Sequence, residues 1–152
     1  MRETDRYMDL ALDQARQAAD RGEVPVGAVV VAAGAGTVLG LAGNRVEELA
    51  DPTAHAEMLA IRAACAMAGL PRLVGCDLYV TLEPCPMCAT AISFARLRRV
   101  YFGAYDPKGG GVDHGARVFD QPTCHHRPEV YGGINEFAAA KLLKDFFKDK
   151  RA

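Results

Sequence analysis

Two short segments of the chain carry the residue types that bind zinc and move protons. The first contains His55 and, two residues later, Glu57; the second contains Cys85 and Cys88, three residues apart in a Pro-Cys-Pro-Met-Cys run. One imidazole and two thiolates are three ligands for a tetrahedral zinc ion, whose fourth position stays free for water. A carboxylate that is not a ligand can carry protons beside that water. We therefore expect one zinc ion per subunit, bound by His55, Cys85 and Cys88, with Glu57 as the catalytic residue.

This combination of groups is typical of hydrolytic deamination. A carboxylate can take a proton from zinc-activated water, pass it to a ring nitrogen of the substrate and then serve the leaving group. Attack of hydroxide on an amidine-like carbon, followed by loss of ammonia, completes the reaction. The pattern H-x-E with P-C-x-x-C is the known signature of zinc nucleobase deaminases, and the chain contains both parts.

The alternative interpretation of the Cys-x-x-Cys pair is a structural zinc site. Such sites normally close with four protein ligands, and the other cysteines and histidines form no second two-ligand motif. They are Cys65, Cys76, Cys124, His114, His125 and His126. Three adjacent ligands in a loop seldom converge on one ion, so we do not expect a second metal cluster at residues 124–126. We expect Cys65 to be a core residue and Cys76 to lie near the start of a strand.

The local sequence places both ligand segments at helix starts. Thr53 is a good helix cap, and residues 54–69 are alanine-rich and periodic, which puts His55 and Glu57 in the first turn. Residues 78–82 predict a strand that Pro84 ends, and Pro86 suits the first position of a helix to about Arg96. A helix start offers unpaired N–H groups and a partial positive charge, which favours thiolate over thiol and would compensate for two thiolates on one zinc ion.

The remaining pattern predicts an α/β protein. The segments are an amphipathic helix over 4–21, an antiparallel hairpin of strands 26–31 and 37–41, a polar loop over 44–53, a strand at 100–102, a long loop over 103–128 and a helix over 134–150. Strands that alternate with helices favour a layered sheet with helices on both faces. At 152 residues we expect one deaminase domain spanning residues 1–152.

Composition restricts the partners and the compartment. The formal net charge is -1, so a polyanion site would have to be local rather than a global basic field. Five cysteines, an odd number, argue against a disulfide framework. The N-terminal residues do not resemble a signal peptide, and no apolar run reaches transmembrane length. We expect a cytoplasmic protein with no membrane partner.

Segments beyond the zinc motif closely resemble the bacterial tRNA-specific adenosine deaminases, which belong to the cytidine deaminase-like superfamily. The matching segments are residues 23–28, 44–45, 51–57, 78–89, 99–104 and 106–110, with Phe146 and Phe147 before basic residues at the C-terminus. The resemblance implies a three-layer α/β/α fold with a central five-stranded mixed sheet, and a homodimer. It implies conversion of adenosine to inosine at the wobble position of a tRNA anticodon loop, with hydroxide on zinc attacking C6 and Glu57 shuttling protons.

The resemblance also implies roles for residues outside the zinc motif. Asn44 and the Ala56 N–H would read the purine, Val26 and Leu82 would pack around the flipped base, and Asp106 would contact the next nucleotide. Contacts to the anticodon loop would come from Lys108, Phe147, Lys150 and Arg151. Read without the family, the last helix has only a small basic excess, which is also typical of a solvated helix end.

Three functions remain open at this point. The leading one is tRNA adenosine deamination; the second is deamination of a free base or nucleoside, of guanine or cytosine type; the third is a non-catalytic, zinc-stabilised scaffold. The aromatic ring of Tyr105 would either stack on a base or pack on the protein. Ile92, Phe94 and Leu97 would suit a dimer interface or the monomer core equally well.

Overall fold

The architecture is a five-stranded mixed sheet between two layers of helices. The computed structural model describes residues 2–151, the side chain of Arg151 excepted. The elements are α1 (Glu3–Asp20), β1 (Gly27–Ala32), β2 (Thr37–Gly43), α2 (Val46–Leu49), α3 (Ala56–Ala68), β3 (Cys76–Leu82), α4 (Pro86–Phe94), β4 (Arg99–Ala104), a 3-10 turn (Val118–Asp120), β5 (Glu129–Tyr131) and α5 (Glu136–Arg151). The three-layer fold that the resemblance implies is confirmed.

The strand order is β2-β1-β3-β4-β5. β1 pairs antiparallel with both β2 and β3, whereas β3, β4 and β5 are parallel. The predicted hairpin of the first two strands is therefore confirmed. The carboxyl ends of the parallel strands β3 and β4 meet at one edge of the sheet, and the chain leaves β3 there directly into the cysteine motif. In open α/β sheets, ligands bind at this edge, outside the carboxyl ends of the strands.

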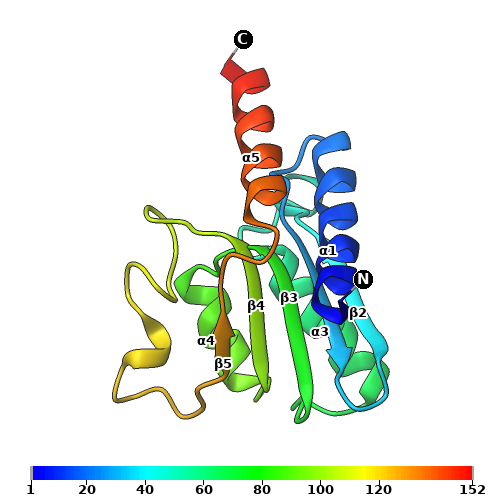
Figure 1. Ribbon diagram of the computed structural model, residues 1–152, viewed down its shortest axis with the longest axis vertical. Helices are drawn as coiled ribbons and strands as arrows, with labels where there is room; N and C mark the ends of the chain where they lie inside the picture. The colour runs from blue at the N-terminus through cyan, green and yellow to red at the C-terminus, as the bar shows by residue number, and fades with distance from the viewer. Residues whose placement is uncertain (1, 152) are drawn as a thin grey trace.

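Both faces of the sheet are buried, which explains why its inner strands are continuously apolar. In β3, Leu78 and Val80 point into the core on the α3 and α4 side, and Tyr79 points to the α1 and α5 side. In β4, Val100 and Phe102 alternate with Tyr101 in the same way. In Figure 1, α1 and α5 cover one face, α3 and α4 cover the other, and α5 extends beyond the end of the sheet.

Two short elements were not predicted from the residues. α2 lies within the expected polar loop, and β5 has only three residues at the edge of the sheet. Neither carries enough periodic positions to produce a hydrophobic pattern. Within residues 2–151 there is no helix with both the length and the apolar character needed to cross a membrane.

Candidate metal and active site

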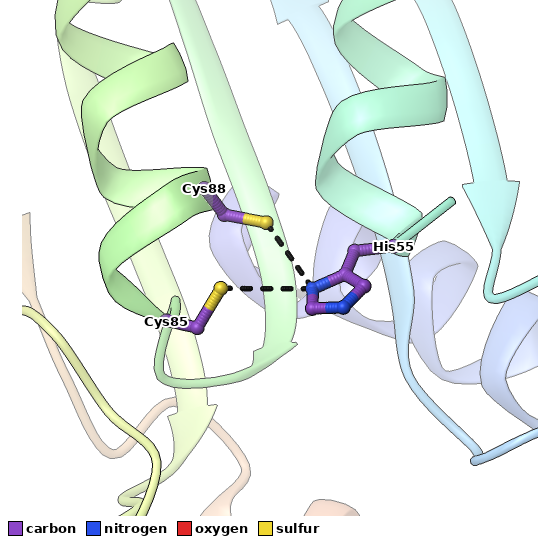
Figure 2. A group of neighbouring side chains, drawn as sticks. All are labelled: His55, Cys85 and Cys88. Carbon is purple, nitrogen blue, oxygen red and sulfur yellow. Dashed lines mark hydrogen bonds between the residues drawn. The ribbon is translucent and has the colours of Figure 1, made fainter. Parts of the chain in front are cut away.

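His55, Cys85 and Cys88 converge at the edge of the sheet (Figure 2). The Nδ1 atom of His55 lies 3.6 Å from the Cys85 sulfur and 3.5 Å from the Cys88 sulfur, and the three ligand atoms lie within 4.8 Å of one another. Bonds of 2.0–2.3 Å at tetrahedral angles separate neighbouring ligand atoms by about 3.6 Å. The three residues therefore fit zinc, with Nδ1 as the imidazole ligand, and leave the fourth position to a non-protein ligand.

Both ligand segments begin helices, although one starts later than expected. His55 is the N-cap of α3, in an extended backbone conformation, and Cys85 is the N-cap of α4 with Pro86 following it. The prediction that Thr53 caps α3 is wrong: its hydroxyl and its N–H both donate to Asp51 Oδ1, at 2.7 and 2.8 Å, in a turn before the helix. Two helix N-termini thus face the metal position, and their partial positive charge favours the thiolate ligands.

Hydrogen bonds among the three ligand residues shift their pKa values. Hydrogen bonds to the Cys85 sulfur, first from Cys88 and then from His55, lower the Cys85 pKa to about 4 despite burial. The pKa of Cys88 is raised, because its thiol donates to Cys85 and because it is buried. The hydrogen bond to Cys85 raises the pKa of His55. A metal ion would displace the protons of this hydrogen-bonded group, because it binds thiolate sulfur and neutral imidazole.

Glu57 lies in the first turn of α3 and is only 4% exposed. Burial raises its pKa to about 7, an effect that the His55 charge opposes. A carboxyl whose pKa lies near neutrality can both accept and release a proton at the working pH. Its position beside the triad, together with this pKa, suits it to carry protons and not to bind the metal.

Asn44 and Ala56 are brought together, but in a way that the sequence did not indicate. The Ala56 N–H donates to Asn44 Oδ1 at 2.8 Å, and Asn44 is 9% exposed. Because a backbone donor must face the oxygen, this contact orients the amide with its NH₂ group turned away from α3. The Ala56 N–H thus holds Asn44 in place, and Asn44 is left as the donor available to a ligand.

The segment that carries Asn44 is anchored from behind. The buried Glu23 accepts the N–H groups of Glu47 and Glu48 at 3.1 and 2.8 Å, which fixes the first turn of α2. Arg21 donates through Nη2 to the Asn44 carbonyl at 3.0 Å. Glu23 lies in a segment that the resemblance includes, yet its anchoring role requires a partner 25 residues away and leaves no local pattern.

Val26 directly precedes β1, and Leu82 is the last residue of β3. The Val26 carbonyl accepts the Asn44 N–H at 3.2 Å, and next to it the Gly27 N–H donates to Thr81 Oγ1 at 3.1 Å. Val26 is buried and Leu82 half-buried. Both therefore lie at the ends of neighbouring strands.

Asp106 and Lys108 lie in a loop organised by Glu83, a residue that sequence reasoning did not single out. The Glu83 carboxylate is buried and accepts hydrogen bonds from the backbone N–H groups of Asp106, Val112, Asp113 and His114 and from the His114 ring. Burial alone would raise the pKa of this carboxyl, but these bonds, the Asp106 N–H first, hold it below its usual value. Only the adjacency of Glu83 to the cysteine motif could have drawn attention to it.

The basic and aromatic residues of α5 lie in the helix layer that contains α1, on the opposite face of the sheet from α3 and α4 (Figure 1). α5 packs on β3, β4 and α1, and its last turns extend past the sheet (Figure 1). Phe147 is 44% exposed, and the Lys150 ammonium lies 5.4 Å from the centre of the Phe146 ring. The predicted role of Arg151 falls on a side chain outside the described residues.

The second cysteine-histidine cluster has a structural role instead. Cys124 Sγ and Ser93 Oγ both donate to the His126 carbonyl, at 3.2 and 2.8 Å, and the His126 ring donates to the Leu97 carbonyl at 2.6 Å. Among the described residues, the only three-ligand group suited to a metal is the triad at 55, 85 and 88. These bonds fix the loop at residues 124–126 to the end of α4.

Fold and site together define a zinc-dependent deaminase, because the sheet edge holds a three-ligand metal position with a free carboxylate beside it. The family model described as "Cytidine and deoxycytidylate deaminase zinc-binding region" matches residues 1–104. The chain belongs to this family, in the group of the tRNA-specific adenosine deaminases. It is 58% identical over 151 residues to the tRNA-specific adenosine deaminase of Agrobacterium fabrum, covering 99% of this chain and 98% of that one.

Two solved structures bear on the substrate. One comes from studies of A-to-I editing by tRNA:A34 deaminases at the wobble position of transfer RNA; it is 59% identical, with a TM-score of 0.88 over 91% of this chain and 99% of the other. The second is guanine deaminase from Bacillus subtilis, 33% identical, with a TM-score of 0.66 over 83% and 82% of the two chains. The chain is therefore similar to both a tRNA-editing enzyme and a free-base deaminase.

Proposed function

We propose that this protein is a zinc-dependent hydrolase that converts adenosine to inosine at the wobble position of a tRNA anticodon loop. The observation that carries this substrate is the 58% identity to a tRNA-specific adenosine deaminase over 99% of the chain. The triad and Glu57 define the reaction but not the base, since the guanine deaminase has a similar fold. Likeness along the whole chain includes the segments that would contact RNA.

The residues divide the chemistry between them. His55, Cys85 and Cys88 hold zinc, which when bound supplies the Lewis acidity that lowers the pKa of water toward about 7. Glu57 takes one proton of that water and delivers it to a ring nitrogen. Once the oxygen has bonded to the carbon, Glu57 takes its remaining proton and delivers it to the departing amino group, which leaves as ammonia. The burial of Glu57 keeps bulk water away from the carboxyl, so both protons come from the attacking water.

Recognition is assigned to the residues around this edge. The Asn44 amide, fixed by the Ala56 N–H, would donate to the purine, and Val26 and Leu82 would enclose the flipped base. Asp106 and Lys108 would meet the neighbouring nucleotide, and the end of α5 would meet the loop backbone. The proposed substrate-binding residues are Val26, Asn44, Ala56, Leu82, Asp106, Lys108, Phe147, Lys150 and Arg151.

We also propose that residues 1–152 act as one domain, as a homodimer in the cytoplasm, where tRNA is modified. Among the interface candidates, Phe94 supports the proposal, because it is 66% exposed whereas Ile92 and Leu97 are fully buried in the core. Phe94 lies with Met58, Met87 and Ala91 around a shallow apolar groove on α3 and α4. A second copy that covers this face would bury large apolar side chains beside the metal helix.

Incubation of the zinc-loaded protein with synthetic anticodon stem-loops, followed by sequencing for A-to-G changes, tests the proposal. We expect conversion at the wobble adenosine alone. The similarity to guanine deaminase makes free guanine the matched competitor substrate, with cytosine and free nucleosides beside it. Release of ammonia from guanine, with none from the stem-loop, would replace this proposal by the free-base function.

A further inference from the structure

The most heavily hydrogen-bonded side chain near the site belongs to a residue with no assigned role. Glu83 lies between the end of β3 and the zinc ligand Cys85, and its side chain is fully buried. Oε2 accepts the N–H groups of Val112, Asp113 and His114 at 3.3, 3.0 and 3.1 Å. Oε1 accepts the Asp106 N–H at 3.0 Å and the His114 Nδ1 hydrogen at 2.8 Å.

These five donors come from one segment, residues 105–114, which we call the β4 loop. Without Glu83, each donor would lose its hydrogen-bond partner. This loss would destabilise the present loop conformation, because a buried N–H group that is neither bonded nor solvated is unfavourable. The loop lies between β4 and the 3-10 turn, and the Val118 N–H of that turn donates to the Gly111 carbonyl at 2.8 Å. The Glu83 carboxylate therefore connects the start of the loop, at Asp106, to its end, at Asp113 and His114, and favours a single loop conformation.

The backbone of the β4 loop lies directly on the zinc-binding turn. The Gly111 N–H donates to the Pro84 carbonyl at 2.8 Å, and Gly110 and Gly111 are buried. A Cβ atom on Gly111 would lie 2.5 Å from the Pro86 nitrogen, and one on Gly110 would overlap Glu83 Oε2. The glycines thus permit a contact in which the turn that positions Cys85 also positions the loop.

The opposite side of the β4 loop presents side chains to solvent. Tyr105 is 40% exposed, although its ring meets Phe102 edge-on with centroids 5.0 Å apart, and Lys108 is exposed. Asp106 Oδ1 accepts the Gly109 N–H at 2.9 Å, which closes the tip. An aromatic face, a carboxylate and an ammonium held on a fixed backbone suit a splayed nucleotide, through stacking and a phosphate contact.

We propose that Glu83 is a positioning residue for RNA recognition: by holding the β4 loop against the zinc-binding turn, it sets the affinity for the nucleotides that flank the target adenosine. This inference rests on the proposed function. The Glu83 side chain is fully buried and both its oxygens are bonded to the loop, so we expect its loss to raise KM and leave the chemical step intact. A residue needed only for folding would change stability without this selective effect.

The decisive variant is Glu83→Gln, assayed as the zinc-loaded full chain. Glutamine keeps the shape but replaces one accepting oxygen by an NH₂ group, so two or three loop donors face another donor. We expect KM for an anticodon stem-loop to rise about tenfold with kcat changed less than about threefold. Amide hydrogen exchange should accelerate at residues 110–114 and not in α3, and the zinc content should stay at one per chain.

Asp77→Asn is the matched control. Asp77 is a buried acid at the other end of β3, where Arg98 binds it through two hydrogen bonds of 2.9 and 2.7 Å. Its substitution should lower the melting temperature and leave KM unchanged. If Asp77→Asn raises KM as much as Glu83→Gln does, or if Glu83→Gln leaves KM and loop exchange unchanged, the positioning role is refuted.

A second variant covers the case in which Glu83→Gln fails to fold. Gly110→Ala leaves Glu83 intact but places a Cβ atom against its carboxylate and 2.6 Å from the Asp106 carbonyl, so the loop must move. It should reproduce the rise in KM at full zinc content; an unchanged KM contradicts the proposal.

If the wild type edits no stem-loop, the proposed function fails, and this role in RNA recognition fails with it. If the wild type edits the stem-loop but Glu83→Gln and Gly110→Ala leave KM unchanged, the role of Glu83 is refuted and the proposed function stands.

Discussion

The metal centre and the two segments beside it are built by different means. At the centre, the three ligands and Glu57 come from the N-caps and first turns of two helices, and each side chain has one task. The flanking segments depend on backbone groups that buried glutamates hold from a distance: Glu23 for the Asn44 segment and Glu83 for the β4 loop. Substitutions at the metal centre should therefore abolish most of the activity, whereas substitutions in the flanking segments should reduce it by degrees.

The largest effect is expected at the metal ligands. Cys88→Ser replaces a metal-binding sulfur by a hydroxyl, and we expect zinc affinity to fall by more than about 100-fold, since the loss of even an outer supporting residue costs 10- to 100-fold. Activity should be undetectable without added zinc. Metal analysis after dialysis checks the affinity. A variant with full zinc content and activity would show that the triad is not the metal site.

Glu57→Gln should come next, with a fall in kcat of about 1,000-fold, because the proton carrier is lost. The variant should keep one zinc ion and its fold. Burial already disfavours the charged carboxylate, as its raised pKa of about 7 indicates, so a neutral amide fits the site. Single-turnover assays with zinc-loaded protein measure the step. Activity near the wild-type level would assign the proton transfers to another group.

A smaller effect is expected from Glu23→Gln, about threefold in kcat/KM. Glu23 holds two N–H groups, one on each oxygen, so glutamine keeps one of them, and Arg21 and Ala56 still hold Asn44. Steady-state kinetics on the stem-loop, beside Glu83→Gln, ranks the two anchors. If Glu23→Gln proves the more damaging, the Asn44 segment and not the β4 loop is the one that depends on a single carboxylate.

The smallest effect is expected from Lys108→Ala, a loss of about two- to threefold in RNA affinity at physiological salt. A single phosphate contact to single-stranded RNA contributes about 0.7 to the slope of log K against log salt, so the slope should fall by that amount. Arg16→Ala, which removes an exposed cation paired with Asp13 on α1, is the control. Equal slopes for Lys108→Ala and wild type would remove Lys108 from the interface.

The same contrast explains what could be predicted from the sequence. The zinc ligands and Glu57 are recognisable because each pair is separated by two or three residues and each follows a helix-start signal. The anchors are not, because Glu83 and His114 are 31 residues apart and nothing near either residue reports the other. α2 and β5 are too short to show a period. Thr53 resembles a helix cap in the sequence, because threonine is a common capping residue just before a helix. In the folded turn its hydroxyl donates to Asp51 instead.

The glycines beneath the β4 loop also bear on how the specificity of such an enzyme can change. Gly110 and Gly111 have no room for a side chain, while Tyr105 and Lys108 face solvent. Substitutions are therefore not tolerated at Gly110 and Gly111, whereas Tyr105 and Lys108 can be replaced without a steric clash. New preferences for flanking nucleotides can evolve, or be selected in the laboratory, by randomising positions 105 and 108 alone, with the metal centre untouched.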